Sequence, residues 1–376
     1  MRIVVDENIP LVEECFGDLG EIVRLPGREM TNEDLRGADA LLVRSVTQVN
    51  AELLRSTPVR FVGTCTIGID HLDTAYLENQ GITWASAPGC NANSVVEYVY
   101  AALAHLNTDW AGKRVGIIGC GNVGGRLYRR LKAQGVECRV YDPFLSTEQI
   151  PDLTSLTDVL GSDIVCMHTP LTRSGPHPSF HLVGAAQLRK LKPGAVLLNA
   201  GRGPVIDNQA LLKHLESGAD LKVVLDVWEP EPDISRPLLQ RVALGSPHIA
   251  GYSYDGKMQG TFMIYEALCR HLGRSPEKDL NALRPSVADP ERRWAGGEPW
   301  PAIQRLIPEV YDITEDDHQL RALAERAEQA QADFAKGFDR LRKEYPKRRE
   351  CGNYRVTGDV SEDAQARLEA LGFRVQ

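Results

Sequence analysis

Short apolar runs alternate with amphipathic stretches from the N-terminus to about residue 270 of the chain. Several of the runs are apolar on both faces, which is typical of parallel strands covered by helices on both sides. The runs are RIVV, ALLV, RFVGT, RVGIIG, CRVYD, DIVCMH, AVLLNA and KVVLDV. Between two of them, NQALLKHLES predicts a helix, because Asp207 is a candidate N-cap and Gly218 follows its end. Strands that alternate with helices predict an α/β fold with parallel sheets.

The pattern changes after residue 272. SPEKDLNALRPSVADPERRWAGGEPWP has five prolines and little periodicity, which predicts a linker or wrapping segment. IQRLIPEVYDI is then a candidate strand, and an apolar stripe between Leu320 and Leu341 predicts one long helix. A basic cluster at Lys347–Arg349, a candidate strand YRVTG, a short helix and a terminal FRV follow. We expect this region to be a small α+β domain.

A complete dinucleotide-binding pattern occupies the middle of the chain. Gly119, Gly121 and Gly124 form a G-x-G-x-x-G motif that follows an apolar strand and opens a helix. These glycines allow a tight turn, close approach of the backbone to a pyrophosphate, and packing of helix on strand. The strand that follows this helix ends in Asp142, where a carboxylate accepts from ribose hydroxyls and repels a 2′-phosphate. The pattern therefore predicts NAD rather than NADP, held by backbone N–H groups at a helix start.

The position of this motif predicts the domain organisation. Roughly 90 residues of α/β character precede it, so the dinucleotide domain is inserted into another domain. We expect two doubly wound parallel-sheet domains and a small α+β C-terminal dimerisation domain. The expected bounds are 1–92 and 254–284 for the substrate-binding domain, 93–253 for the Rossmann domain, and 285–376 for the dimerisation domain.

Composition and charge exclude several classes of protein. A net charge of −8 and a pI of about 5.7 are unfavourable for binding nucleic acid. No apolar run is long enough to span a bilayer, so no membrane partner is expected. The start MRIVVDENIP enters a strand directly and lacks a signal-peptide pattern. Eight scattered cysteines without a CxxC pair fit reduced thiols, which predicts a cytoplasmic protein.

Three charged side chains follow predicted strands, and ligands of open α/β sheets bind at such strand ends. LLNAGRG ends in Arg202 and Gly203, VVLDVWEPEP contains Glu231, and LGSPHIAGYS contains His248. An arginine binds a carboxylate bidentately, a histidine exchanges a proton with a hydroxyl or carbonyl, and a glutamate orients the histidine. Combined with NAD, this set predicts hydride transfer at the carbon of a 2-hydroxy acid.

Each residue also has a plainer interpretation. Taken singly, Arg202 is also compatible with a surface arginine among loop glycines, Glu231 with an exposed loop glutamate, and His248 with a structural histidine. Their joint occurrence, in order, after a complete dinucleotide motif favours the catalytic interpretation. His177 and His181 have the i, i+4 spacing of metal ligands on a helix, but the prolines around them predict a loop. No metal site is predicted.

In this order, GCGNVG, YDP, NAGRGPVID, LDVWEPEP and PHIAG resemble the D-isomer-specific 2-hydroxyacid dehydrogenases. The resemblance covers about residues 1–270 and implies that Arg202, Glu231 and His248 are the catalytic set. It also implies that Asp226 lies near the nicotinamide and Thr169 along the cofactor. The residues expected to contact NAD are Gly119, Gly121, Asn122, Val123, Gly124, Asp142, Thr169, Asp226 and Gly251.

Further motifs narrow the resemblance to one branch of this family. They are VDENIP, VRSVTQVN, GTCTIGIDHLD, GCNANSVVEYV and PHIAGYSYDGK, together with the whole C-terminal tail. The members of this branch oxidise 4-phospho-D-erythronate at C2 in bacterial vitamin B6 biosynthesis. The resemblance implies that Ser45, Thr66 and Tyr252 contact the substrate and that the chain is a homodimer. Arg44, at the end of LLVR, is a further candidate for the phosphate.

Alternatives remain open at this point. The chain could be a sibling enzyme that acts on 3-phosphoglycerate or glycerate, or an NAD-sensing binding protein without turnover. The intact set of arginine, glutamate and histidine argues against a sensor. The Lys347–Arg349 cluster has two interpretations: a solvated basic turn, or an arm that reaches a partner's active site and binds the substrate phosphate.

Overall fold

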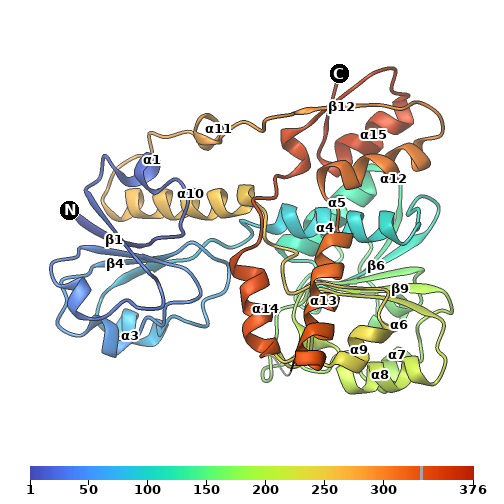
Figure 1. Cartoon of the computed structure of the whole chain (residues 1–376), viewed down its shortest axis with the longest axis horizontal. Helices are drawn as coiled ribbons and strands as arrows, with labels where there is room; N and C mark the ends of the chain where they lie inside the picture. The colour runs from blue at the N-terminus through green and yellow to red at the C-terminus, as the bar shows by residue number, and fades with distance from the viewer. Residues whose placement is uncertain (331–332) are drawn as a thin grey trace. The chain divides into compact units, whose positions relative to one another are not determined.

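The computed structural model describes two compact units (Figure 1). The described residues are 1–330 and 333–376. The first unit combines residues 1–91 with residues 252–286, and the second combines residues 92–251 with residues 287–376. Both units are therefore built from segments that are far apart in the sequence.

A five-stranded parallel sheet with the order β2-β1-β3-β4-β5 forms the centre of the first unit. Along β1, Ile3 and Val5 belong to one buried cluster, and Val4 belongs to another. Both faces of the sheet are thus buried, which explains the continuous apolar runs. The strands are β1 Arg2–Asp6, β2 Glu21–Leu25, β3 Ala40–Val43, β4 Phe61–Thr64 and β5 Thr83–Ala85. The helices are α1 Val12–Phe16, η1 Glu33–Leu35, α2 Ala51–Leu54, α3 Thr74–Asn79, α10 Tyr254–His271 and α11 Leu280–Leu283.

A six-stranded parallel sheet with the order β11-β10-β9-β8-β6-β7 forms the centre of the second unit. Because β6 lies between β7 and β8, the winding reverses at β6, and ligands bind at such a switch point. The strands are β6 Arg114–Ile118, β7 Glu137–Tyr141, β8 Ile164–Met167, β9 Ala195–Asn199, β10 Leu221–Leu225 and β11 Leu244–Gly245. The helices are α4 Ala92–His105, α5 Asn122–Ala133, α6 Leu156–Leu160, α7 Ala185–Leu188, η2 Gly203–Val205, α8 Asn208–Glu216 and α9 Arg236–Arg241.

The predicted elements up to residue 270 are confirmed. All eight predicted runs form strands of the two sheets. The helix predicted after Asp207 is α8, whose N-cap carboxylate accepts from the N–H of Ala210. Gly218 follows it with a φ of +87°. The strands that the pattern did not predict, β2, β5 and β11, are short or partly exposed and lie at sheet edges.

Residues 287–376 add a three-stranded parallel sheet and further helices. The prediction of a strand at IQRLIPEVYDI is wrong, because this segment belongs to a helix, α12, up to Val310. Its buried residues Ala302, Ile303, Leu306 and Ile307 recur at helical spacing. The strands are β12 Glu291–Arg293, β13 Arg355–Thr357 and β14 Arg374–Val375. The helices are α12 Pro299–Val310, α13 Thr314–Ala330, α14 Phe334–Lys343, η3 Cys351–Asn353 and α15 Glu362–Leu371.

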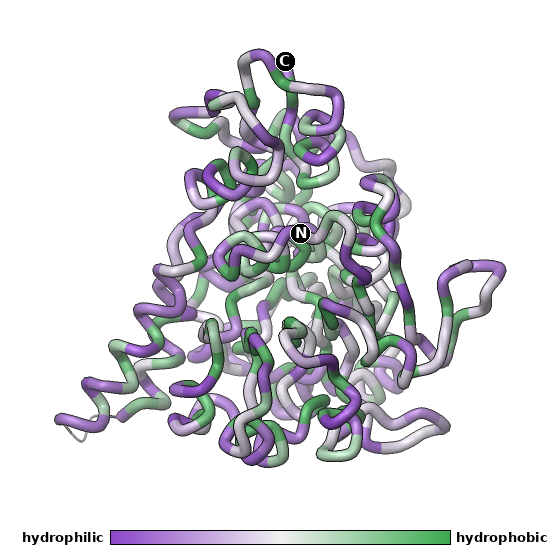
Figure 2. The backbone as a smooth tube through the Cα atoms, turned by 90° about the vertical axis from the view of Figure 1, so that its right-hand side faces the viewer, coloured by the Kyte–Doolittle hydropathy of each residue, from purple (hydrophilic) through white to green (hydrophobic). Residues whose placement is uncertain are grey.

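The predicted single helix between Leu320 and Leu341 is also wrong, because the segment forms two helices, α13 and α14. A new helix begins where the Asp333 carboxylate accepts from the N–H of Lys336 and caps α14. Figure 2 shows the two helices side by side, with hydrophobic and hydrophilic residues alternating along both. The cap at Asp333 lies within the apolar stripe, so the stripe extends over two helices, α13 and α14, instead of one.

The apolar stripe of α13 and α14 packs on its own chain. Leu320, Leu323, Phe334 and Phe338 belong to the same buried cluster as residues of the six-stranded sheet and α9. Arg321 strengthens this contact, because its guanidinium donates to the carbonyl oxygens at the end of α9. The C-terminal segment therefore covers the core of the second unit.

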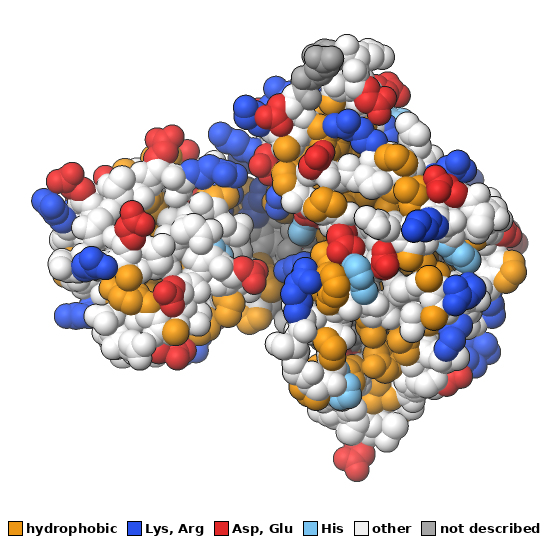
Figure 3. All heavy atoms as spheres, turned by 90° about the horizontal axis from the view of Figure 1, so that it is seen from below, with side chains coloured by type: hydrophobic (Ala, Val, Ile, Leu, Met, Phe, Trp, Pro, Cys, Tyr) orange, Lys and Arg blue, Asp and Glu red, His pale blue; other side chains and the backbone are white. Residues whose placement is uncertain are grey.

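The surface carries charges of both signs. On the face shown in Figure 3, Lys and Arg side chains lie among Asp and Glu side chains.

In the part of the chain that the structure describes, no helix combines the length and the apolar character that a membrane crossing requires.

The central residue of the basic cluster Lys347–Arg349 fits neither a solvated turn nor an arm that reaches a partner. The Arg348 side chain is buried, and its guanidinium lies over the ring of Tyr311 at 3.9 Å. It donates to backbone carbonyl groups of its own unit. Arg348 is therefore neither solvated nor extended toward a partner.

A second buried charge, Glu97 on α4, lies at the same contact with the C-terminal segment. Its Oε1 accepts from the N–H of Cys351 at 2.9 Å and from Nδ2 of Asn93 at 3.0 Å. Burial, reinforced by the nearby carboxylate of Glu350, raises the pKa of Glu97 to about 8. The folded protein thus holds a proton on Glu97 at neutral pH.

Glu97→Gln should make the stability of the protein less dependent on pH. The unfolded chain releases this proton near the ordinary pKa of 4.5, whereas the folded chain keeps it up to about 8. The free energy of unfolding of the wild type therefore falls as the pH rises through this window, and glutamine has no such titration. Thermal unfolding midpoints at several pH values would measure the effect. The exposed Glu362→Gln on α15 is the control, and equal pH slopes in wild type and Glu97→Gln would contradict the prediction.

Candidate active site

The glycine-rich turn between β6 and α5 is shaped for the close approach of a ligand. Gly119 has a φ of +86°, which strains any other residue. At Gly124, a Cβ atom would lie 1.9 Å from the carbonyl oxygen of Gly119. At Gly121, the N-cap of α5, a Cβ atom would meet no atom of the described residues within 4 Å. The first N–H groups of α5, on Asn122 and Val123, lack helical partners and can donate to a phosphate.

Asp142, after β7, lies beside this turn. Its carboxylate accepts from the N–H of Cys120 at 2.9 Å and from the N–H of Phe144 at 3.1 Å. A carboxylate at this position is suited to the hydroxyl groups of an adenosine ribose and disfavours a 2′-phosphate. The structure thus brings the two ends of the predicted dinucleotide motif together.

Thr169, after β8, lies next to the same turn. Its hydroxyl donates to the carbonyl oxygen of Ile118 at 3.1 Å. A Cβ atom on Gly119 would lie 3.0 Å from this hydroxyl oxygen, and one on Gly201 would lie 3.0 Å from the Thr169 backbone. The ends of β6, β8 and β9 therefore form one continuous edge of the sheet.

Arg202, after β9, lies at this edge with its side chain exposed. One guanidinium nitrogen donates to the carbonyl oxygen of Gly201 at 2.8 Å, and no other partner is found among the described residues. The backbone passes very close to the next strand's loop here, since a Cβ atom on Gly203 would lie 1.8 Å from the Trp228 carbonyl oxygen. The exposed donors of Arg202 are thus available for an anion.

Glu231 and His248 form a hydrogen-bonded pair after β10 and β11. Oε2 of Glu231 lies 2.7 Å from Nδ1 of His248, and its Oε1 accepts from the N–H of Trp228 at 2.8 Å. Burial tends to raise the pKa of Glu231, but the hydrogen bonds from His248 and the Trp228 N–H outweigh it and lower the pKa. The carboxylate is therefore ionised at neutral pH, and Nε2 of His248 is the nitrogen left for a substrate.

The backbone at His248 adopts a left-handed conformation with a φ of +58°. Such a conformation costs free energy in a residue with a side chain and needs support from its surroundings. The N–H of His248 donates to the Asp226 carbonyl oxygen at 2.8 Å. The buried Asp226 carboxylate then accepts from the N–H groups of Ile249 and Ala250 and from the Ser246 hydroxyl. Asp226 thus shapes the loop that carries His248.

The order of strands in the sheet explains why the loops of the three predicted catalytic residues are neighbours. Arg202, Glu231 and His248 follow β9, β10 and β11, which are neighbours in the sheet. Because the carboxyl ends of parallel strands lie at the same edge, the three loops are adjacent. Gly251, a predicted cofactor contact, is the last residue of the second unit before the chain enters the first.

The predicted substrate residues Arg44, Ser45, Thr66 and Tyr252 belong to the first unit. Arg44 and Ser45 follow β3, and Nε of Arg44 lies 3.1 Å from Oδ1 of the fully buried Asp6 at the end of β1. The Asp6 carboxylate holds the Arg44 guanidinium at Nε, and the Arg44 side chain remains about one-third exposed. Asp6 was not identified from the sequence.

A hydrogen-bonded chain holds Thr66, two residues beyond β4. Its hydroxyl lies 2.7 Å from the hydroxyl of Thr64, which lies 2.9 Å from Nε2 of His71. Burial lowers the pKa of His71, so the ring is neutral at neutral pH. Tyr252 carries the ammonium group of Lys257 over its ring at 5.4 Å. Because β1, β3 and β4 are neighbours, Asp6, Arg44 and Thr66 lie at one edge of their sheet.

The histidines of the predicted loop do not face each other. His181 Nε2 lies 2.9 Å from both carboxylate oxygens of Glu229, whereas His177 contacts the ring of Phe144. Within residues 1–330 and 333–376, no group of three His, Cys, Asp or Glu side chains is arranged to hold a metal ion.

The donor set of the second unit fits a dinucleotide. It offers helix N–H groups for a pyrophosphate, a carboxylate for ribose hydroxyls, and open space at Gly121 where a side chain would intrude.

Comparison with known proteins agrees with this geometry. Residues 93–250 match the family model described as D-isomer specific 2-hydroxyacid dehydrogenase, NAD binding domain. Residues 285–372 match a domain of unknown function, DUF3410. A protein of Cellvibrio japonicus named erythronate-4-phosphate dehydrogenase is 63% identical over 376 residues, covering 100% of both chains. A protein of the same name from Teredinibacter turnerae is 51% identical, covering 99% of this chain and 98% of its own.

The chain belongs to the D-isomer specific 2-hydroxyacid dehydrogenase family. Its full-length relatives are named erythronate-4-phosphate dehydrogenase, as the resemblance of the motifs predicted. Membership confirms the predicted α/β fold and NAD as the cofactor.

Solved structures show the same fold. D-lactate dehydrogenase from Aquifex aeolicus, complexed with NAD and lactic acid, aligns with a TM-score of 0.58 and 21% identity over 73% of this chain and 96% of its own. The NAD⁺-bound 3-phosphoglycerate dehydrogenase of Entamoeba histolytica aligns with a TM-score of 0.60 and 22% identity over 73% and 95%. About a quarter of the present chain lies outside each alignment.

Glu231→Gln should lower kcat for 2-hydroxy acid oxidation about 10- to 150-fold. With His248 as the proposed base, the variant loses the carboxylate that lies 2.7 Å from Nδ1 and stabilises the imidazolium. The initial rate of NADH formation at saturating NAD and substrate measures kcat. Glu229→Gln, which removes the carboxylate facing His181 in the same loop, is the control and should stay within about twofold of the wild type. An unchanged kcat in Glu231→Gln would contradict the proposed role of the pair.

Proposed function

We propose that the protein catalyses the NAD-dependent oxidation of 4-phospho-D-erythronate at C2. The product is 2-oxo-3-hydroxy-4-phosphobutanoate, and the reaction is a step in the biosynthesis of pyridoxal phosphate. The observation that carries the proposal is the intact Arg202, Glu231 and His248 set in a chain 63% identical, over its full length, to a relative with this name.

His248 is the base of this reaction. Its Nε2 takes the proton of the C2 hydroxyl as the C–H bond breaks and a carbonyl group forms. Bound NAD supplies the hydride acceptor. The Glu231 carboxylate, 2.7 Å from Nδ1, stabilises the imidazolium that results. In the reverse direction, the same imidazolium returns the proton to the carbonyl oxygen.

Arg202 binds the substrate carboxylate. Its guanidinium has donors without a protein partner among the described residues, at the edge where the cofactor motif ends. Two parallel hydrogen bonds to the carboxylate would orient C2 toward the nicotinamide.

The edge of the first unit is proposed to bind the rest of the substrate. Arg44, held by the buried Asp6, offers a fixed cation for the phosphate. Ser45, Thr66 and Tyr252 are the proposed polar contacts. The hydrogen-bonded chain from Thr66 to His71 fixes the orientation of the Thr66 hydroxyl.

Arg202→Lys should test the proposed substrate binding. A lysine keeps the charge but loses the planar fork, so kcat/KM for 4-phospho-D-erythronate should fall about 10- to 150-fold. The rate is measured by the absorbance of NADH. The wild type is also assayed with D-3-phosphoglycerate and with D-glycerate as alternative substrates, and with NADP in place of NAD. A wild-type enzyme that prefers either competing acid would overturn the proposed substrate. A lysine variant whose kcat/KM is within twofold of that of the wild type would show that Arg202 does not bind the substrate.

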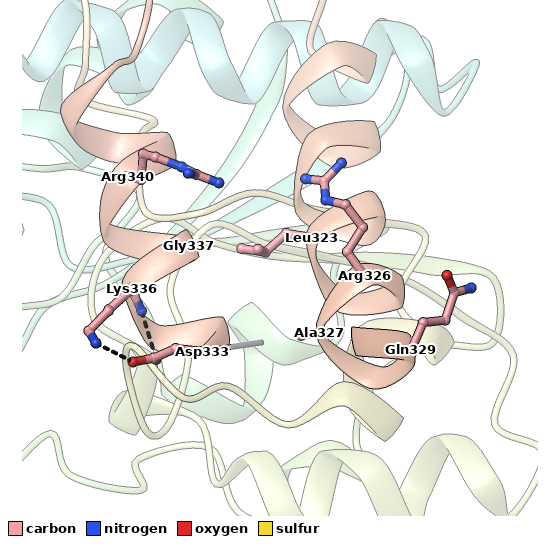
Figure 4. A pocket seen from close by; sticks show the side chains of 8 residues that line it. All are labelled: Leu323, Arg326, Ala327, Gln329, Asp333, Lys336, Gly337 and Arg340. Carbon is pink, nitrogen blue, oxygen red and sulfur yellow. Dashed lines mark hydrogen bonds and ion pairs between the residues drawn. The ribbon is translucent and has the colours of Figure 1, made fainter. Parts of the chain in front are cut away.

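We also propose that the chain is a homodimer through residues 285–376. The support is an open groove of about 510 Å³ between α13 and α14, shown in Figure 4. Leu323, Ala327 and Gly337 form its floor, and the exposed Arg326 and Arg340 line its sides. An apolar floor with a charged rim is typical of a protein contact.

Charge reversal of both Arg326 and Arg340 to Glu should convert the dimer to a monomer. The two substitutions place carboxylates at the rim of the groove while leaving its packing intact. Light scattering measures the mass in solution. The control is Lys213→Glu, on an exposed face of α8. A doubly substituted chain that stays dimeric would refute this contact.

A further inference from the structure

Arg348 joins the C-terminal segment to the loop of His248. Its side chain is 7% exposed, and Nη2 donates to the carbonyl oxygen of Ala250 at 3.0 Å. The same nitrogen hydrogen-bonds to the hydroxyl of Ser94 and approaches the Ser94 carbonyl oxygen at 3.3 Å. All three residues belong to the second unit.

The surroundings of Arg348 hold its guanidinium in place. The guanidinium carbon lies 3.9 Å from the centre of the Tyr311 ring. The ring of Tyr311 and that of Tyr345 are held in turn, because the hydroxyl groups of both tyrosines donate to the carboxylate of Asp316. Burial opposes the charge of Arg348, but Coulombic interactions with acidic side chains around it, Asp316 among them, raise its pKa.

Both backbone polar groups of Ala250, its N–H and its carbonyl oxygen, form hydrogen bonds. Its N–H donates to the Asp226 carboxylate at 3.1 Å, and its carbonyl oxygen accepts from the Ser94 hydroxyl at 2.7 Å and from Arg348. Ala250 lies two residues beyond His248, whose left-handed backbone needs such support. Asp226 holds one side of this loop, and the C-terminal segment holds the other.

We infer that Arg348 is a positioning residue for the reaction: it fixes the loop that aims His248, from within the same chain. This role rests on the proposed function of His248. It gives the C-terminal segment a part in catalysis that is independent of dimerisation. A misplacement of a catalytic group by about 1 Å is enough to slow a reaction by about 100-fold.

The place of the contact in the chain supports this role. Ser94 and Ala250 lie within three residues of the two points, 91/92 and 251/252, where the chain enters and leaves the second unit. Arg348 joins these two points through one guanidinium nitrogen. A side chain of the C-terminal segment thus connects the beginning and the end of residues 92 to 251.

Arg348→Met and Arg367→Met provide a matched test. Arg367 on α15 is also 7% exposed, donates to Asp109, and lies over the ring of Trp110 at 5.3 Å. Both variants lose a buried guanidinium in the same unit, and both should have lower melting temperatures. Only Arg348→Met should lose turnover.

The expected result with 4-phospho-D-erythronate is a fall in kcat of about 10- to 100-fold for Arg348→Met. Arg367→Met should stay within about twofold of the wild type. Deuterium at C2 should give a larger isotope effect on kcat in Arg348→Met, because hydride transfer becomes slower. Arg348→Lys, which keeps one charged donor, should recover part of the rate. Should Arg348→Met fail to fold, Ser94→Ala removes a donor to Ala250 and should lower kcat about 3- to 10-fold.

Amide hydrogen exchange separates this inference from the proposed function. The N–H groups of Ile249 and Ala250 should exchange faster in Arg348→Met than in Arg367→Met, with no substrate present. Faster exchange together with no oxidation of 4-phospho-D-erythronate by the wild type would support the loop contact and overturn the proposed function. Equal exchange and equal kcat in the two methionine variants would overturn the inference.

Discussion

The buried carboxylate of Asp226 is the interaction on which the catalytic loop depends. It accepts from two consecutive backbone N–H groups and from the hydroxyl of Ser246. Burial raises the pKa of Asp226, so these donors are what keep a charge acceptable at this position. Leaving either N–H group unpaired would cost about 1–3 kcal/mol. The left-handed backbone of His248, and with it the position of the imidazole, therefore rests on one side chain at the end of β10.

Around this loop, the order of the strands in the sheet determines which residues lie close together. The residues proposed for catalysis follow three neighbouring strands, and the cofactor turn follows the strand where the winding reverses. Backbone N–H groups, rather than lysines, provide the positive potential for a pyrophosphate. This explains how a chain with a net charge of −8 can hold an anionic cofactor. Single arginines, Arg202 and Arg44, are proposed to bind the charged groups of the substrate.

Local patterns were sufficient to predict eight of the strands before residue 270, the glycine turn and the order of Arg202, Glu231 and His248, because each depends on neighbours in the sequence. The pairing of Asp6 with Arg44, or of Arg348 with Ala250, joins residues that are distant in the chain, and no local pattern carries it. The C-terminal region was predicted least well for a different reason. Its apolar stripe indicated helix correctly, but the cap at Asp333 lies inside the stripe and divides it.

The way the two units share the chain also determines the order in which they can be completed during synthesis. The sheet of the first unit is finished by residue 85, yet its buried cluster includes Met258 and Ile264 of α10, which emerge only after the whole sheet of the second unit. The second unit in turn waits for Leu320 and Phe338 to cover its core. Neither unit can close around its core until a later part of the chain has left the ribosome. A nascent chain thus carries the finished sheet of the first unit with an exposed apolar face until α10 has been made, and the C-terminal segment completes the fold.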